Sequence, residues 1–116
     1  MNRQQRGQQA EQTACRYLEG QGLRLITSNY RCRCGEIDLI MDHGDSLVFV
    51  EVRYRRHDRY GSAAETVDAR KRARIIRCAQ QYLQRHPAAR DRPARFDVIT
   101  LDAGRGLHWI PDAFGL

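Results

Sequence analysis

Residues 35–54 read GEIDLIMDHGDSLVFVEVRY, and they contain two apolar runs separated by a short polar break. Gly44-Asp45 in that break is one of the residue pairs that favour a tight β-hairpin. With this turn, Leu39 faces Val50, and one face of the hairpin is apolar throughout. A one-residue slip would mix charged and apolar groups on both faces, whereas a two-residue shift keeps the pattern and stays open. The apolar face would hold Ile37, Leu39, Met41, Val48, Val50 and Val52.

The same register gathers charged residues at one end of the opposite face. Asp38 would lie opposite Glu51, and Glu36 opposite Arg53. Like charges directly opposite each other destabilise a sheet, so this pairing indicates a cation that offsets them. Two carboxylates with waters are a common way to hold Mg²⁺. The alternative is a solvated outer face, on which water and salt screen the repulsion.

The chain has 116 residues, of which 41% are hydrophobic, and this suits a single domain spanning residues 1–116. The polar residues 1–6 are expected to be disordered. No stretch approaches the length of a membrane span, and the N-terminus lacks the pattern of a signal peptide. We therefore expect a cytoplasmic protein that does not contact membranes. The four cysteines are then expected to be reduced.

The formal net charge is +6, and among the 20 basic residues every one except Lys71 is arginine. Arginine presents a planar fork of donors that matches phosphate. The balance of charge predicts a polyanionic partner, most often nucleic acid. We expect DNA rather than RNA as that partner. A GC-rich genome would explain arginine in place of lysine, but it would not explain the excess of positive charge.

Periodicity and turn residues predict the remaining elements around the hairpin. Helices are expected over residues 8–21 and 67–86, and strands over 23–29, 95–101 and 107–110. With the hairpin, the order is α-β-β-β-α-β-β, which predicts an α/β fold with a mixed central sheet flanked by helices.

Basic residues occur in the connection 30–34, in the polar loop 54–64 and along the second predicted helix. Those on the helix recur at helical spacing, so they would form a stripe that suits phosphate contacts. A solvated charged face is the alternative. The candidate nucleic-acid contacts are Arg31, Arg33, Arg55, Arg56, Arg59, Arg70, Lys71, Arg74 and Arg77.

The spacing of the hairpin acids resembles a known signature. Asp38, twelve intervening residues and then Glu51-Val52-Arg53 resemble the D…(D/E)-x-K pattern of the restriction-endonuclease-like nucleases. The wider sequence resembles the YraN-like family of small uncharacterised bacterial proteins over nearly the whole chain. The resemblance rests on GEIDLI and FVEVR, and also on Gly7, Glu11, Tyr17-Leu18, Asn29-Tyr30-Arg31, Lys71 and Arg95-Phe96-Asp97-Val98.

This resemblance implies a restriction-endonuclease-like fold similar to that of Holliday-junction resolvases, which commonly act as homodimers. It implies that Asp38 and Glu51 bind Mg²⁺ or Mn²⁺ and that Glu11, on the first helix, completes the site. A surface glutamate near the start of a helix is the alternative for Glu11. Arg53 stands where the signature has lysine. Arginine stays protonated, so it can clamp a phosphate but cannot act as a base.

Three functions are compatible with these residues. The first is a metal-dependent endonuclease that acts on nucleic acid, with branched DNA as a candidate substrate. The second is a catalytically silent nucleic-acid-binding module on the same fold. The third is a protein-interaction module with an acidic pocket and a basic rim. Metal-dependent cleavage separates the first from the second, and salt-sensitive DNA binding separates both from the third.

Overall fold

The computed structural model describes residues 2–55, 67–103 and 106–115. Its elements follow the predicted order α-β-β-β-α-β-β, so the α/β class with a restriction-endonuclease-like arrangement is confirmed. The elements are α1 (Arg3–Gly20), β1 (Arg24–Cys32), β2 (Gly35–His43), β3 (Ser46–Arg55), α2 (Ala69–Arg85), the short 3₁₀ helix η2 (Pro87–Ala89), β4 (Ala94–Asp102) and β5 (Gly106–Phe114).

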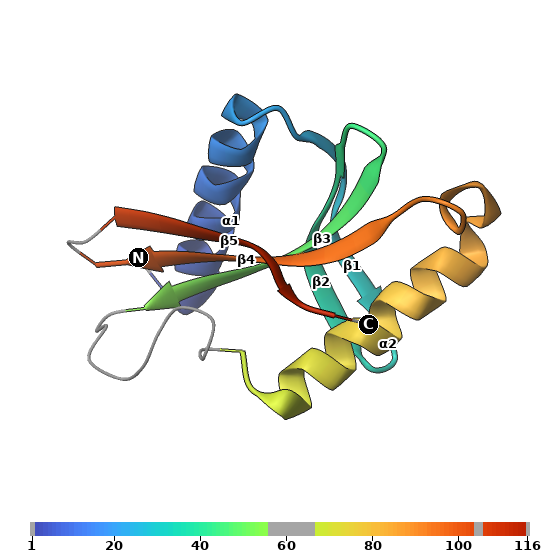
Figure 1. Cartoon of the computed structure of the whole chain (residues 1–116). Helices are drawn as coiled ribbons and strands as arrows, with labels where there is room; N and C mark the ends of the chain where they lie inside the picture. The colour runs from blue at the N-terminus through green and yellow to red at the C-terminus, as the bar shows by residue number, and fades with distance from the viewer. Residues whose placement is uncertain (1, 56–66, 104–105, 116) are drawn as a thin grey trace.

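The strands form one five-stranded mixed sheet in the order β1-β2-β3-β4-β5. β3 and β4 are parallel, and the other neighbouring pairs are antiparallel. Parallel neighbours need a long crossover connection, and α2 lies in the segment that joins β3 to β4. The two long helices cover opposite faces of the sheet, as Figure 1 shows.

The β2–β3 hairpin has the register predicted from its turn. Leu39 pairs with Val50 and Met41 with Val48, and the pairing continues to the turn itself. The alternative shift by two residues is therefore wrong. Gly44 takes a φ of 61°, a left-handed conformation that glycine adopts without the steric cost of a side chain.

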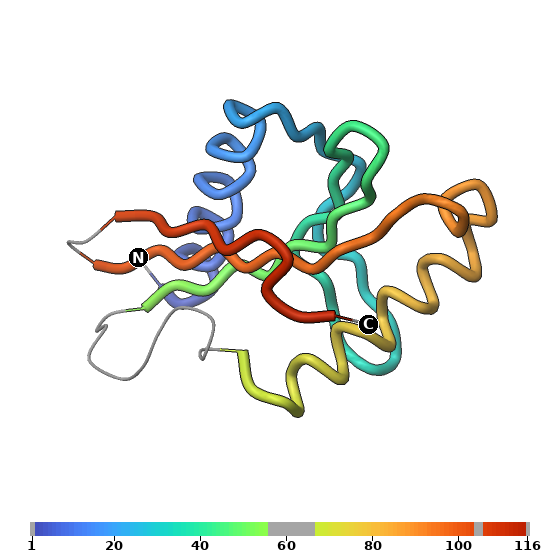
Figure 2. The backbone as a smooth tube through the Cα atoms, viewed as in Figure 1, coloured from blue at the N-terminus to red at the C-terminus, as the bar shows by residue number. Residues whose placement is uncertain are grey.

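Beyond Leu39 and Val50 the two strands separate, and here the predicted pairing is wrong. The Val52 N–H donates to the Asp38 Oδ2 at 2.8 Å instead of to a backbone carbonyl of β2. β2 stays with β1, while β3 continues along β4 as far as Arg55. Figure 2 shows the teal β2 turning towards α2 as the green β3 runs beside β4. The hairpin therefore opens at the acidic residues.

Both faces of the hairpin are buried. On one face, Leu39 and Val50 pack against Ala14 and Leu18 of α1. Ile37 was expected on that face, but it packs in the cluster of α2, because β2 has left β3 by that point. Asp38 and Glu51 at the charged end are also buried, so the alternative of a solvated outer face is wrong. The cluster of α2 also includes Ile40, Phe49, Ile75, Cys78, Ala79 and Tyr82.

The helix ends are set by side-chain caps. Asn2 and Gln5 form a reciprocal capping box, which satisfies backbone N–H groups at the helix start. The prediction of disorder for residues 1–6 is therefore wrong for the first turn of α1. α2 begins after Asp68, whose side chain accepts from the Lys71 N–H at 2.9 Å. Within the described residues, neither helix has the length and apolar character needed to span a bilayer.

A disulfide joins Cys32, at the end of β1, to Cys78 on α2. The expectation that all four cysteines are reduced is wrong for this pair, which the sheet and helix bring together from positions 46 residues apart. Cys15 and Cys34 are free. The bond fixes the middle of α2 beside the β1–β2 turn, next to the point where the hairpin opens.

Candidate metal and nucleic-acid site

Asp38 and Glu51 lie together where β2 and β3 separate. Asp38 is 8% exposed and Glu51 is 5% exposed. One oxygen of Asp38 accepts the Val52 N–H described above, and the charge of Glu51 is close enough to raise the pKa of Asp38. Opening of the hairpin therefore creates a buried pair of acids at the centre of the sheet, held by the backbone of both strands.

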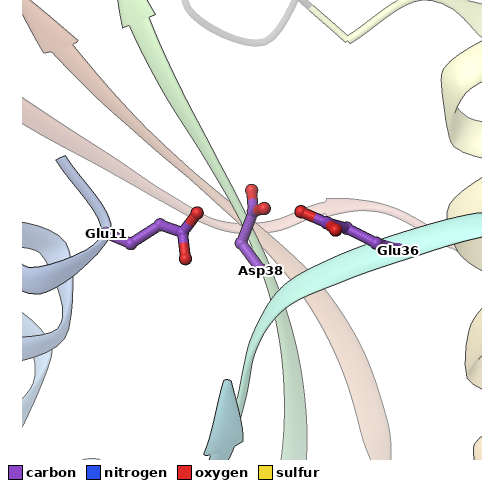
Figure 3. A group of neighbouring side chains, drawn as sticks. All are labelled: Glu11, Glu36 and Asp38. Carbon is purple, nitrogen blue, oxygen red and sulfur yellow. The ribbon is translucent and has the colours of Figure 1, made fainter. Parts of the chain in front are cut away.

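Two further acids approach Asp38 from different elements. Glu11 reaches it from α1, and Glu36 reaches it from the start of β2, as Figure 3 shows. One carboxylate oxygen from each of Glu11, Glu36 and Asp38 lies within 4.8 Å of the others. The hairpin sequence placed Glu36 opposite Arg53, but the opening of the strands turns it towards Asp38 instead. Glu36 is thus a site residue that the sequence analysis missed.

Burial and neighbouring charge strongly affect these acids. Burial is the main cause that raises the pKa of Asp38 to about 9, and the negative charge of Glu51 raises it further. The Val52 N–H opposes this shift in the pKa. Burial, and then the charge of Glu36, also raises the pKa of Glu11. Crowded acids of this kind are stabilised as anions only if a cation joins them.

Lys71 is the basic residue that contacts the buried pair of acids, Asp38 and Glu51, through Glu51. Its Nζ lies 2.7 Å from the Glu51 Oε1, and 35% of its side chain is exposed. Lys71 and Arg74 of α2 line a cavity of about 170 Å³ together with Glu36, Asp38 and Glu51. The sequence analysis placed Lys71 among the phosphate contacts. One sequence feature could have separated Lys71 from the phosphate contacts, namely that it is the only lysine in the chain.

Arg53 lies two residues beyond Glu51 on β3 and is half-buried. It pairs with Thr100 of β4 through the backbone. In the described part of the chain, its guanidinium makes no ion pair with an acid of the cluster. The guanidinium therefore stays available at the open end of the hairpin, where a phosphate group could reach it.

The predicted nucleic-acid contacts fall into distinct groups. Arg70, Arg74 and Arg77 are exposed on α2, and Arg74 lies beside the acidic cavity. In contrast, Arg55 forms a bidentate pair with Asp102, with only 13% of its side chain exposed. We therefore assign Arg55 a structural role.

The remaining candidates lie at the β1–β2 turn or outside the described residues. Arg31 is exposed on β1 and forms a 3.3 Å ion pair with Glu36. Arg33 is exposed in the turn itself. Arg56 and Arg59 lie outside the described residues, as does most of the loop that carries them. The exposed arginines described near the acids therefore come from α2 and from the β1–β2 turn.

The donor set fits a hard divalent cation. Mg²⁺ and Mn²⁺ prefer carboxylate oxygens and keep several waters, and Glu11, Glu36, Asp38 and Glu51 supply such oxygens from three elements. A raised pKa such as that of Asp38 is expected of crowded acids that have no cation beside them. We conclude that the residues present can hold one divalent cation.

The described elements define an α/β protein with a restriction-endonuclease-like order of helices and strands. The chain belongs to the uncharacterised protein family UPF0102, the YraN-like family, whose model matches residues 10–101. It is 52% identical over 112 residues to a UPF0102 protein of Nitrosococcus oceani, a match that covers 94% of this chain and 90% of that one. It is 54% identical over 110 residues to a UPF0102 protein of Halorhodospira halophila, with 95% and 87% covered.

Because the pKa of Asp38 is raised, ionisation of this residue opposes folding of the metal-free protein. Below about pH 4 the carboxyl is protonated in both the folded and unfolded states. As the pH rises towards the folded-state pKa of about 9, the unfolded state loses this proton first, so stability falls. An asparagine side chain at this position would mimic the protonated acid and still accept the Val52 N–H. We expect Asp38→Asn to raise the free energy of unfolding at about pH 8 by about 1–3 kcal/mol.

The measurement is urea unfolding of both proteins in EDTA between about pH 4.5 and about pH 8, a range that starts near the ordinary pKa of an aspartate. The difference in the free energy of unfolding should shrink steadily as the pH falls. A difference that is constant over this range would show that Asp38 titrates normally in the folded protein.

Proposed function

We propose that the protein is a cytoplasmic endonuclease that depends on Mg²⁺ or Mn²⁺ and hydrolyses phosphodiester bonds in nucleic acid. The single observation that carries this proposal is the convergence of buried Asp38 and Glu51 with Glu11 and Glu36 where the hairpin opens. A protein rarely retains such a costly concentration of acids without a functional reason.

Asp38 and Glu51 are the proposed metal ligands, and Glu11 and Glu36 complete the set directly or through water. When bound, the cation would supply positive charge at the scissile phosphate and lower the pKa of a nearby water. Arg53 would donate hydrogen bonds to a phosphate oxygen and stabilise the charge that develops there. As a permanently protonated group, it would not accept the proton of the attacking water.

The nucleic acid would lie across α2 and the β1–β2 turn. Arg70, Arg74 and Arg77 are exposed on one helix, and Arg74 lies beside the acidic cavity. Phosphates that follow this row would bring the backbone to the acids. DNA is the proposed polymer, with a branched form as the candidate substrate, and a homodimer would place two such sites on one branched molecule.

A catalytically silent nucleic-acid-binding module is the second candidate. Arg53 favours it, because an arginine replaces the lysine of the nuclease signature and cannot serve as a base. In that case the acids and their cation would hold the hairpin open, and the arginines of α2 would provide the affinity. The two candidates differ in one measurable property, which is metal-dependent cleavage.

Cleavage is tested by single-turnover assays on a four-way DNA junction and on linear duplex and single-stranded DNA, with Mn²⁺ or EDTA. We expect cleavage only with the metal. Asp38→Ala and Glu51→Ala should each lower the rate by about a thousandfold, because each removes part of the site that stabilises transition-state charge by several kcal/mol.

Glu11→Gln and Glu19→Gln form a matched pair for this experiment, since both change an acid of α1 and Glu19 is exposed away from the cluster. Glu11→Gln should slow cleavage by about tenfold or more, and Glu19→Gln should leave it unchanged. If the wild type binds every substrate but cleaves none of them in Mn²⁺ or Mg²⁺, the binding-module function replaces the nuclease.

Binding is tested by the salt dependence of the DNA dissociation constant in EDTA. The change is Arg70, Arg74 and Arg77 to alanine. If all three contact duplex phosphates, the slope of log affinity against log salt should become less negative by about 2.7. The matched control replaces Arg3, Arg16 and Arg85, which are exposed elsewhere on the two helices, and it removes the same charge. Equal slopes for the two triple variants would place the interface on another surface.

A further inference from the structure

Glu51, one of the proposed metal ligands, forms an ion pair with Lys71. The Lys71 ammonium lies 2.7 Å from a Glu51 oxygen at the entrance of the acidic cavity. Glu51 is buried, whereas about a third of the Lys71 side chain is exposed. Lys71 can therefore turn towards solvent when another cation takes its place, but Glu51 cannot leave the buried cluster.

The helix holds Lys71 at this place. Lys71, Ile75 and Cys78 follow one another at helical spacing, so they lie on the same face of α2. Ile75 and Cys78 are buried in the core, and Cys78 is bonded to Cys32. The Asp68 cap accepts the backbone N–H of Lys71 itself. The backbone of Lys71 is thus fixed from both sides, and the flexible part is the four-carbon side chain.

We propose that Lys71 is the counter-ion of the metal-free site and that its ammonium dissociates from Glu51 when a divalent cation binds. The proposal rests on the proposed function, because it concerns the same metal site. One ammonium beside Glu51 offsets part of the repulsion among the acids. A divalent cation at the same carboxylate would be repelled by that ammonium at close range, so the two cations exclude each other.

This exchange has a consequence for substrate binding. Once released from Glu51, the ammonium stays tethered to α2 beside the cavity, where a phosphate bound at the site could accept it. A phosphate that accepts Lys71 favours metal binding, and by linkage the metal favours phosphate binding. The site would therefore bind its cation weakly in the free protein and more tightly when nucleic acid is present.

The experiment is a calorimetric titration of Mn²⁺ into the DNA-free full-length protein. We expect Lys71→Met to bind Mn²⁺ about tenfold more tightly than the wild type, which corresponds to about 1.4 kcal/mol. Lys71→Arg keeps the charge and should retain the wild-type affinity. Arg85→Met removes a positive charge from the far end of α2 that does not contact the acids, so it should change the affinity for Mn²⁺ much less than Lys71→Met does.

Thermal unfolding provides a second readout that also reports whether the variants fold. In EDTA, Lys71→Met should unfold at a lower temperature than the wild type, because the acids lose their counter-ion. On addition of Mn²⁺ its Tm should rise by more than that of the wild type. A structural role for Lys71 would produce only the first of these effects.

The outcomes distinguish this inference from the proposed function. An Mn²⁺ affinity of Lys71→Met that is equal to or weaker than that of the wild type overturns the role of Lys71, while cleavage by the wild type would still support the nuclease. Tighter binding by Lys71→Met in a protein that cleaves no substrate supports the counter-ion role and removes the nuclease. Absence of Mn²⁺ binding by both the wild type and Lys71→Met overturns the counter-ion role, and the cleavage assay then decides the nuclease.

Discussion

The hydrogen bond from the Val52 N–H to the Asp38 carboxylate marks the point on which the site depends. In a continuous hairpin this N–H would pair with the backbone of β2, and Asp38 would point away from it. Here a side chain replaces the backbone acceptor, so β2 and β3 can part without leaving a buried donor unsatisfied. The opening admits Glu36 from one side and Glu11 from the other, and these acids surround Asp38.

The two helices bring charged groups to the opening from opposite faces of the sheet. α1 packs on one face of the sheet and contributes Glu11, while α2 packs on the other face and contributes Lys71. The apolar contacts of both helices, together with the disulfide to α2, hold the charged groups at fixed separations against their mutual repulsion. The acids that would bind a cation destabilise the metal-free protein. At this site, the proposed function therefore comes at the expense of stability.

The sequence predicted the features that depend on local pattern. The Gly44-Asp45 turn predicted the hairpin register that the structure has, although the alternation of apolar residues alone left a two-residue shift open. The helices and strands were predicted in the right order. The resemblance carried by GEIDLI and FVEVR predicted the family, which the match over residues 10–101 confirms. The sequence could not predict where the pairing between β2 and β3 ends. That point depends on β1, which stays paired with β2, and on β4, which stays paired with β3. Glu36 and Ile37 were misplaced for this reason. The contact of Lys71 with Glu51 requires the tertiary position of α2, which no local pattern encodes.

The central claim is that the acids at the opening of the hairpin bind a divalent cation. The most direct test is an anomalous difference map from a crystal of the wild-type protein soaked in Mn²⁺, with data collected above the manganese absorption edge. We expect a peak within about 2.5 Å of an Asp38 carboxylate oxygen, with Glu51 or Glu11 as a further ligand, and no peak there in Asp38→Ala. Manganese bound elsewhere on the protein, with none at Asp38, would contradict it.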